Sequence, residues 1–238
     1  MKLTILGNNG PYPKVGGACS GYLVSSDSGK TNIVVEMGTG SLANLRGNIA
    51  CSKVDAVLLS HLHYDHMSDM LPMVYALQFD PPKKPIPVYA PESPAEVLGL
   101  LKQAACYDVR TIGDVQIGEM KISVMKARHP VETYGMRIEC DGRSLGYTGD
   151  SNETEGQSAF FEGCDVLLAD AGLSEADWSE KAPHFSAAGC GQLARNAKVG
   201  KLLLTHVNPR YAEADLEREA RGAFECASFT VIGESYRI

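Results

Sequence analysis

The segment His61-Leu62-His63-Tyr64-Asp65-His66 constrains this chain more than any other feature, because it places four potential metal ligands within six residues. Apolar residues of strand length precede it at 54–60, and apolar residues at helical spacing follow it from Met67 to Leu77. The segment therefore occupies a loop between a strand and a helix, which is where functional side chains are commonly carried.

The spacing of the four side chains predicts how they share metal ions. Side chains two residues apart in an extended chain point the same way, so His61 and His63 can reach one ion together. A turn that begins at Tyr64 would let Asp65 and His66 face a second ion beside the first. Imidazole and carboxylate are typical ligands of zinc and related divalent ions. The alternative, a polar loop whose histidines only cap a helix, suits a single histidine better than this cluster.

The composition is that of an ordinary globular enzyme, with 44% hydrophobic and 21% charged residues in 238. The net charge of −7 argues against a general nucleic-acid binder, because the phosphate backbone selects for basic surfaces. The seven cysteines are odd in number and lack C-x-x-C spacing, which indicates reduced thiols. No signal-peptide pattern and no apolar run of roughly 20 residues is present, so we expect a cytoplasmic protein without a membrane segment.

Strands and helices follow one another along the whole length, which predicts one domain over residues 1–238. Strands are expected at 2–6, 20–25, 31–36, 54–60, 86–90, 107–112, 115–117, 119–127, 135–139, 144–148, 166–170, 201–205 and 229–232. Helices are expected at 40–46, after the histidine cluster, at 93–105 behind a Ser93–Glu96 capping box, around 160–162, at 186–198 and at 212–225. Two sheets with helices outside them, a four-layer αββα sandwich of the α/β class, would bury these elements best.

Several polar residues stand where an expected strand ends. They are His61, His129, Asp150, Asp170 and His206. Strand ends gathered at one rim of a sandwich would bring these groups together. The glycine-rich corner at 37–40 is expected to turn close beneath them. The chain has six histidines. The remaining one, His184, precedes the expected helix start at Ser186.

These motifs resemble those of the metallo-β-lactamase fold superfamily, specifically its hydrolase branch with the H-x-H-x-D-H motif. The run from Val57 to His66 resembles the first motif with its strand. His129, Tyr147-Thr148-Gly149-Asp150 and Leu204-Thr205-His206 resemble the later metal motifs in order. A narrower similarity, to ribonuclease Z-like proteins and small phosphodiesterases, is carried by residues 183–186 and 206–211.

The resemblance implies an αββα sandwich with two divalent ions at one edge between the sheets. Zinc is the expected ion, and manganese or iron stays open on ligand type alone. The redox branch of the superfamily has an acidic residue where this chain has His63, which argues against a di-iron oxidoreductase. The implied ligands are His61, His63 and His129 for the first ion, Asp65, His66 and His206 for the second, and Asp150 as the bridge between them.

Such a site would attract an anionic ester. Two divalent ions carry about +4, the two aspartates return about −2, and a bridging hydroxide serves as the nucleophile. Asp65 is expected to orient the attacking water, and His184 to contact substrate or protonate the leaving group. For His184 the alternative is a structural hydrogen bond. Ser186 is expected either to bind substrate phosphate at the helix start or to be only the N-cap.

We therefore expect a phosphodiesterase acting on a small or cyclic phosphodiester. Ribonuclease Z-type cleavage of tRNA 3′ ends is disfavoured, because only a short hairpin separates His129 from Asp150, where the main form of that family carries a tRNA-gripping arm. Hydrolysis of a carboxylic ester, thioester or lactone is the alternative reaction. A metal-binding sensor or scaffold without turnover is the alternative outside enzymes, and a homodimer is expected by analogy alone.

Overall fold

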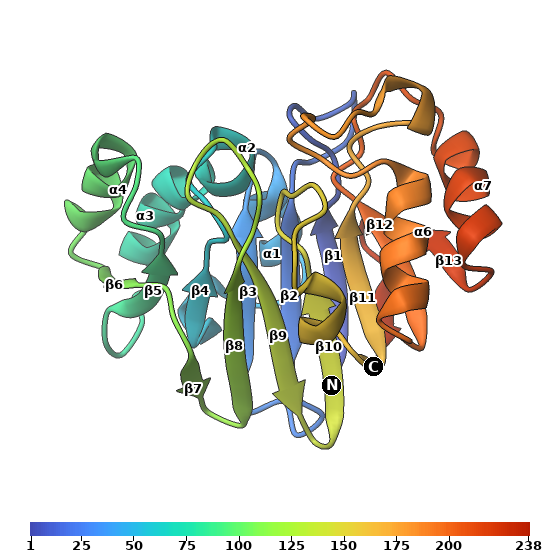
Figure 1. Ribbon diagram of the computed structural model, residues 1–238. Coiled ribbons are helices and arrows are strands. Elements are labelled where there is room, and N and C mark those ends of the chain that lie inside the picture. The colour runs from blue at the N-terminus through green and yellow to red at the C-terminus, as the bar shows by residue number, and fades with distance from the viewer.

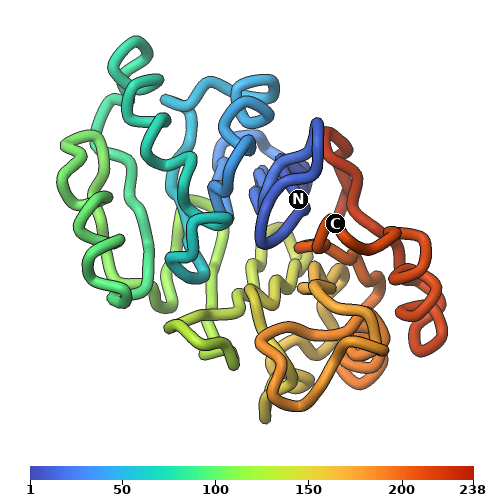
Figure 2. The backbone as a smooth tube through the Cα atoms, turned by 90° about the horizontal axis from the view of Figure 1, so that it is seen from above, coloured from blue at the N-terminus to red at the C-terminus, as the bar shows by residue number.

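The computed structural model describes residues 1–238 and has two seven-stranded sheets packed face to face, with helices on both outer faces (Figures 1 and 2). This arrangement confirms the four-layer αββα sandwich expected from the sequence. It also explains why most strands are apolar on both sides, since each sheet contacts the other sheet on one face and helices on the other.

The first sheet is built from the N-terminal half of the chain and closed by the last strand. Its order is β14 (Ser235–Arg237), β1 (Lys2–Gly7), β2 (Gly21–Ser25), β3 (Asn32–Met37), β4 (Ala56–Leu58), β5 (Ile86–Ala90) and β6 (Tyr107–Thr111). The helical segments of this half are α1 (Ser41–Arg46), the 3-10 turn η1 (Cys51–Lys53), α2 (Tyr64–Met67), α3 (Met70–Phe79) and α4 (Ala95–Lys102).

The second sheet comes from the C-terminal half. Its order is β13 (Ala227–Phe229), β12 (Lys201–Thr205), β11 (Val166–Asp170), β10 (Arg143–Tyr147), β9 (Tyr134–Cys140), β8 (Met120–Lys126) and β7 (Val115–Ile117). The helical segments here are α5 (Gln157–Phe160), η2 (Glu175–Asp177), α6 (Ala187–Asn196) and α7 (Glu213–Ala223). None of the helices combines the length and the apolar character needed to cross a bilayer.

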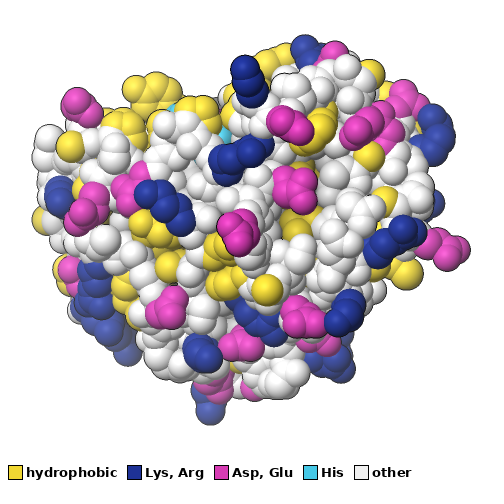
Figure 3. Space-filling view, in the orientation of Figure 1, with side chains coloured by type: hydrophobic (Ala, Val, Ile, Leu, Met, Phe, Trp, Pro, Cys, Tyr) yellow, Lys and Arg dark blue, Asp and Glu magenta, His cyan; other side chains and the backbone are white.

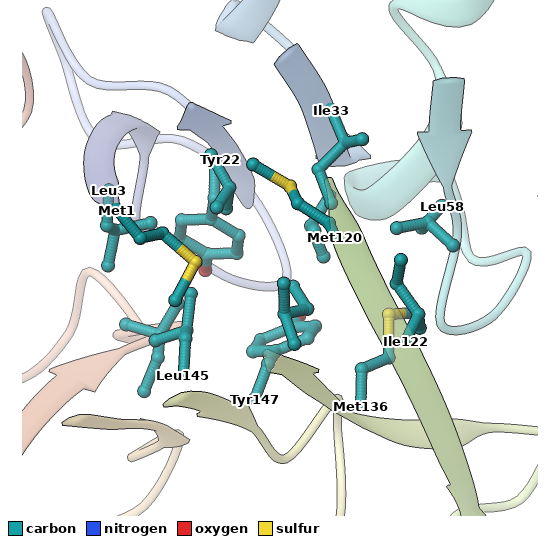
Figure 4. Close-up of a cluster of buried hydrophobic side chains, with 14 of the residues drawn as sticks. Met1, Leu3, Tyr22, Ile33, Leu58, Met120, Ile122, Met136, Leu145 and Tyr147 are labelled. Atoms are coloured by element: carbon teal, nitrogen blue, oxygen red, sulfur yellow. The ribbon is translucent and has the colours of Figure 1, made fainter. Parts of the chain in front are cut away.

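The core between the sheets contains 22 buried residues, several of which are drawn in Figure 4. The alternation of a strand supplies it: Ile33 and Val35 of β3 point into this layer, while Val34 points to the helices outside. Each fully buried side chain of this size stabilises the fold by about 1.5–3 kcal/mol. This layer therefore fixes how the two sheets face each other.

The hairpin of β9 and β10 has the tight turn that its Asp-Gly pair predicts. Asp141 and Gly142 have φ values of 55° and 71°, and Cys140 pairs with Arg143 across the turn. Both central residues at positive φ are characteristic of a type I′ turn, which matches the twist of the strands. The hairpin confirms the sequence prediction and carries the chain back to Asp150.

The helical pattern that follows the histidine cluster is divided into α2 and α3. The break lies at Ser68 and Asp69. The backbone N–H of Asp69 donates to Met37 O, and its carboxylate accepts the N–H of Leu42 at 2.8 Å. Contacts with neighbouring segments therefore take the place of one continuous helix. As a result Leu71, expected on the buried face, is 40% exposed.

The predicted capping box at Ser93–Glu96 is wrong. The N-cap of α4 is Pro94, and no side chain caps the helix. The backbone N–H groups of Glu92 and Ser93 instead donate to the carboxylate of Glu132, which comes from the loop between β8 and β9. A tertiary partner has replaced the local one that the pattern suggested.

The strand predicted at 229–232 lies two to three residues earlier, at Ala227–Phe229, and the strand β14 was not predicted. β13 runs parallel to β12, and the chain then turns at Gly233, whose φ is 88°. It crosses to the first sheet, where Leu3 pairs with Tyr236. The two termini consequently lie side by side in both views of the backbone (Figures 1 and 2).

Candidate metal centre

The segments that carry the candidate ligands all lie at the upper edge of the sandwich in Figure 1. They follow the parallel strands β4 and β12, follow β10, and include the loop between β8 and β9. Carboxyl ends of parallel strands open at the same edge of a sheet, and ligands commonly bind there. Histidine atoms are visible at this edge in a notch of the surface (Figure 3).

The histidine loop turns at the residue where the spacing requires it. His63 is extended (φ −67°, ψ 150°) and is the N-cap of α2, which begins at Tyr64. The glycine corner of β3 lies directly beneath this loop, because a β-carbon on Gly38 would lie 1.9 Å from the carbonyl oxygen of Asp65. Only a glycine permits this contact, so the corner has the closeness expected from the sequence.

Three histidines and one aspartate form the first cluster. His63 Nδ1 lies 3.0 Å from His61 Nε2 and 3.2 Å from His129 Nε2. His61 Nε2 lies 3.6 Å from Asp150 Oδ2. Ligand atoms held by one tetrahedral zinc ion at about 2.0–2.1 Å lie roughly 3.3 Å from one another. The nitrogens therefore converge at the spacing of ligands to a single ion.

Asp150 also belongs to a second cluster, with Asp65, His66 and His206. His206 Nε2 lies 3.1 Å from Asp65 Oδ2 and 3.2 Å from Asp150 Oδ2. His66 Nε2 lies 3.2 Å from Asp150 Oδ1. All seven side chains expected from the sequence are thus brought together, in two groups that share Asp150.

The hydrogen bonding of these atoms shows whether metal ions suit the site. His66 Nε2 and Asp150 Oδ1 are buried and have no hydrogen-bond partner, although they lie 3.2 Å apart. Buried polar atoms are normally partnered, so a ring nitrogen and a carboxylate oxygen that face each other without a hydrogen bond indicate that both point at a shared space between them. With imidazole and carboxylate as the only donors, the residues present fit divalent cations.

The histidines of the first cluster are ready to bind a cation. Burial lowers the pKa of His61, His63 and His129, and the charge of a neighbouring histidine adds to this effect at His61 and His63. Neutral imidazole is the form that coordinates metal. Burial acts the other way on Asp150, but the surrounding histidines outweigh it and hold the pKa of that carboxyl well below its usual range.

In the second cluster the pKa values of the histidines are raised, so these residues favour binding protons where they would bind a cation. Burial lowers the pKa of His206, but Asp150 and Asp170 outweigh it and raise the pKa to about 10. The charges of Asp150 and Asp65 likewise raise the pKa of His66 well above its ordinary value, against the effect of burial. The buried carboxylates therefore need positive charge beside them, and binding of a cation would release these protons.

In three of the candidate histidines the second ring nitrogen lies close to an oxygen atom. His129 Nδ1 lies 3.1 Å from Pro183 O, and His61 Nδ1 lies 3.0 Å from Ser60 Oγ. His206 Nδ1 lies 3.2 Å from Asp170 Oδ1. Hydrogen-bond partners such as those of His129 and His61 fix the tautomer and the direction of a metal-binding imidazole. His206 Nδ1 makes no hydrogen bond to Asp170, and neither ring nitrogen of His66 has a partner.

Two acidic residues of the site were not assigned a role from the sequence. Asp170 was noted only as a strand-end residue, and Glu36 only as the last residue of the strand expected at 31–36. Both are buried, with 1% and 0% exposure, and both approach candidate ligands. An acidic residue at the end of an otherwise apolar strand, beside a glycine corner in the case of Glu36, is the signal that identifies them.

His184 lies at the edge of the second cluster. Its ring stacks on that of His206, with centroids 5.0 Å apart and planes at 23°. Its Nδ1 lies 2.8 Å from Asp170 Oδ2, its side chain is 19% exposed, and its Nε2 has no protein partner. Burial lowers the pKa of His184, but the charge of Asp170 outweighs it and raises the pKa above its ordinary value.

Ser186 is the N-cap of α6. Its hydroxyl accepts the N–H of Gly189 at 3.0 Å and donates to Glu175 Oε2 at 2.5 Å, and the residue is 2% exposed. The capping role is thus present in the structure. Contact of Ser186 with substrate stays a prediction, and its hydroxyl already has two partners.

Comparison with known proteins gives the family. The beta-lactamase superfamily domain matches residues 31–207. The probable metallo-hydrolase YhfI of Bacillus subtilis (strain 168) is 30% identical over 235 residues, which cover 94% of each chain. A crystal structure of YhfI superposes with a TM-score of 0.93 at 28% identity, over 99% of this chain and 98% of that one.

Two further similarities lie at greater distance. A ribonuclease Z of Archaeoglobus fulgidus is 25% identical over 99% of this chain and 96% of its own. A diphosphatase from the PhnP family has the same fold, with a TM-score of 0.78 at 18% identity over 100% and 97% of the two chains. The chain therefore belongs to the beta-lactamase superfamily, and the resemblance read from its motifs is confirmed.

Proposed function

We propose that this protein is a hydrolase that uses two divalent metal ions to cleave a small or cyclic phosphodiester. The observation that carries the proposal is the pair of clusters that share Asp150. These two clusters offer two adjacent cation sites, whereas an enzyme with a single metal ion would need only one. The similarity to a probable metallo-hydrolase supports the hydrolytic class. The similarity to ribonuclease Z and to a PhnP-family diphosphatase supports phosphate chemistry.

The seven clustered side chains would bind the ions as two sets of ligands. Bound divalent ions, zinc first among them, would supply an activated water and a positive field for the phosphate. His61, His63 and His129 would hold one ion, Asp65, His66 and His206 would hold the other, and Asp150 belongs to both groups.

Asp65 is proposed to orient the attacking water as well as to ligate. Burial raises the pKa of Asp65, but His66 and His206 beside it outweigh burial and lower the pKa below its ordinary value. An ionised carboxylate accepts hydrogen bonds only, so it can fix the direction in which a water presents its lone pair.

His184 is proposed to protonate the leaving group. Asp170 Oδ2 lies 2.8 Å from Nδ1, which leaves Nε2 without a protein partner, and the charge of Asp170 raises the pKa of the ring and so favours its protonated form. A general acid placed in this way typically contributes 10²–10⁴-fold. Because Asp170 also lies 3.2 Å from His206 Nδ1, one carboxylate lies beside both a candidate ligand and the proton donor.

The short β9–β10 hairpin and the net charge of the protein both favour a small substrate. Only Asp141 and Gly142 join β9 to β10, so no long arm extends between His129 and Asp150. The net charge of −7 also disfavours a large polyanion. Ribonuclease Z action on tRNA precursors is the second candidate, favoured by the match to the Archaeoglobus enzyme along nearly the whole chain.

A substrate panel with metal analysis on the same sample tests the proposal. The purified protein is assayed on bis-p-nitrophenyl phosphate, a cyclic nucleotide, a lactone, a thioester and an unprocessed tRNA. We expect metal-dependent turnover of the small phosphodiesters and close to two ions per chain. Preference for the lactone or thioester, or a single ion at saturation, would reject the proposal. Preference for the tRNA would favour the second candidate.

The role of His184 is tested by changing the leaving group. His184→Ala should slow cleavage of a nucleotide ester, whose alkoxide needs a proton, by about 10²–10⁴-fold. It should slow release of p-nitrophenolate far less, because that anion leaves without a proton. Equal losses with both leaving groups would assign His184 to binding or structure instead.

Ser186→Ala separates the two roles of Ser186. Loss of the N-cap alone costs about 1 kcal/mol of stability and leaves the KM unchanged. A raised KM at unchanged kcat would show that the hydroxyl reaches substrate.

A further inference from the structure

Glu36 is a buried carboxylate on an irregular piece of strand. It is 0% exposed and has a φ of 60°, a backbone conformation that residues other than glycine rarely adopt. On the neighbouring strand, Tyr22 pairs with Val35 and Gly21 pairs with Met37, so Glu36 is the extra residue of a β-bulge. Bulges re-aim a side chain and are common beside active sites.

The side chain of Glu36 is directed at the histidine loop. Its Oε1 accepts the backbone N–H of Ser60 at 3.0 Å and lies 3.6 Å from His66 Nδ1. Ligand atoms of Glu36, His61 and His66 all lie within 4.8 Å of one another. The residue therefore touches the base of the loop at two points, on the side away from Asp65 and Asp150.

No lysine or arginine side chain pairs with the carboxylate of Glu36. His66 is its one ion-pair partner, and its Oε2 has no hydrogen-bond partner. A buried carboxylate is stable only when positive charge or hydrogen bonds compensate it. The compensation must therefore come through His66, and this links Glu36 to whatever His66 binds.

The geometry assigns the two nitrogens of His66. Nδ1 faces Glu36 at 3.6 Å, and Nε2 faces Asp150 Oδ1 at 3.2 Å. A carboxylate beside Nδ1 favours the tautomer with the proton on that nitrogen, which leaves the lone pair of Nε2 free for a cation. Neither ring nitrogen of His66 has a hydrogen-bond partner, so the charge of Glu36 is what distinguishes the surroundings of Nδ1.

We propose that Glu36 is a positioning residue for the second metal ion: its carboxylate beside His66 Nδ1 favours the proton on that nitrogen and leaves Nε2 for the cation, while the hydrogen bond that it accepts from Ser60 N–H fixes the start of the loop. The inference rests on the proposed metal centre but not on the identity of the substrate. It predicts that Glu36 acts on metal affinity without being a ligand.

Glu36→Gln is the informative substitution. Glutamine keeps the size and one oxygen, which can still accept the N–H of Ser60. The oxygen that accepts from Ser60 is also the one nearest His66 Nδ1, so the substitution keeps the oxygen in place and removes the negative charge beside Nδ1. Asp69→Asn is the control, since Asp69 is a half-buried carboxylate that also accepts a backbone N–H, from Leu42 at 2.8 Å, and it contacts no histidine of the centre.

Zinc affinity of each variant is measured by competition with a chromophoric chelator. We expect Glu36→Gln to weaken one of the two ions by about 10–100-fold, the usual effect of losing such a partner, and to leave the other nearly unchanged. Asp69→Asn should leave both affinities unchanged. In a zinc titration of the ¹⁵N-histidine-labelled proteins, the His66 resonance with the proton on Nδ1 should appear at a higher zinc concentration in Glu36→Gln than in the wild-type protein.

The outcomes are distinguishable. If the wild-type protein binds two zinc ions and Glu36→Gln binds them equally well, the role of Glu36 is overturned and the centre stands. If the wild-type protein binds fewer than two, the proposed centre fails and this inference fails with it. If both variants lose stability without zinc and neither loses affinity, Glu36 serves the fold alone, which also overturns the inference.

Discussion

The backbone at Gly10 lies directly against the imidazole of His206, so close that a β-carbon on Gly10 would lie 1.9 Å from His206 Nε2. The N–H of Gly10 donates to Val207 O at 3.1 Å and holds the two segments together. The loop after β1 is therefore part of the wall of the candidate metal centre, although none of its residues is a candidate ligand.

Gly10→Ala should displace His206. A methyl group cannot fit beside Nε2, and a shift of about 1 Å in a catalytic group can cost 10²-fold in rate. We expect zinc content to fall towards one ion per chain and hydrolysis to fall by about 100-fold. Gly113→Ala is the control, because a β-carbon there meets nothing within 4 Å. Equal zinc content in the two variants would mean that the loop yields and His206 stays in place.

The metal-free protein should lose stability as the pH rises above neutrality. In the metal-free protein the pKa of His206 is raised to about 10, so its proton stabilises the fold fully below about pH 6.5. That stability is lost as pH rises through the folded pKa. The metal-free protein should therefore melt at lower temperature as pH rises from 7 to 10.

Zinc binding competes with the same protons, so the increase in melting temperature on zinc addition should grow over this range. Calorimetry at each pH, with and without chelator, measures both curves. An increase that does not depend on pH would contradict the assignment of His206 as a ligand.

Asp170→Asn should lower the pH at which kcat begins to fall on the alkaline side of its pH profile. The charge of Asp170 raises the pKa of His184, against burial, so removing that charge lowers the pKa. A general acid is active while protonated, and its activity is lost as pH rises through its pKa. The fall in kcat should therefore begin at lower pH in Asp170→Asn. His184→Gln should lack this fall, and its persistence there would assign it to another group.

Two neighbouring tyrosines should respond differently to loss of their hydroxyls. The rings of Tyr22 and Tyr147 lie 5.3 Å apart in the core between the sheets. Tyr22 shares a hydrogen bond of 2.7 Å with Thr205 Oγ1, whereas the buried hydroxyl of Tyr147 has no partner. Tyr22→Phe should cost about 0.5–1.5 kcal/mol, and Tyr147→Phe should be neutral or stabilising. Urea denaturation of the metal-free proteins measures both, and a larger loss in Tyr147→Phe would reveal a partner for that hydroxyl.

The parts of the fold that the sequence predicted are those set by local pattern. The Asp141-Gly142 turn fixes its hairpin through its own backbone preferences, and the apolar run before His61 identifies a buried strand. The motif spacing was equally informative, since His63 is extended and the helix begins at Tyr64, as alternation requires.

The parts that were missed depend on distant segments. Ser93 resembles a helix cap, but the carboxylate of Glu132 satisfies its backbone instead. The strand β14 has three residues and no apolar alternation, and it exists because β1 offers an edge. Glu36 and Asp170 are single carboxylates whose importance follows only from the histidines placed beside them by the fold.

The division of the chain between two sheets has a consequence for how the halves stay joined. Four of the seven candidate ligands precede β5, and the other three, His129, Asp150 and His206, belong to the second sheet's half. The cations would then act as a clasp across the seam of the sandwich. Neither half, expressed as a separate fragment, can assemble a complete set of donors, so zinc should promote reassociation of a split chain.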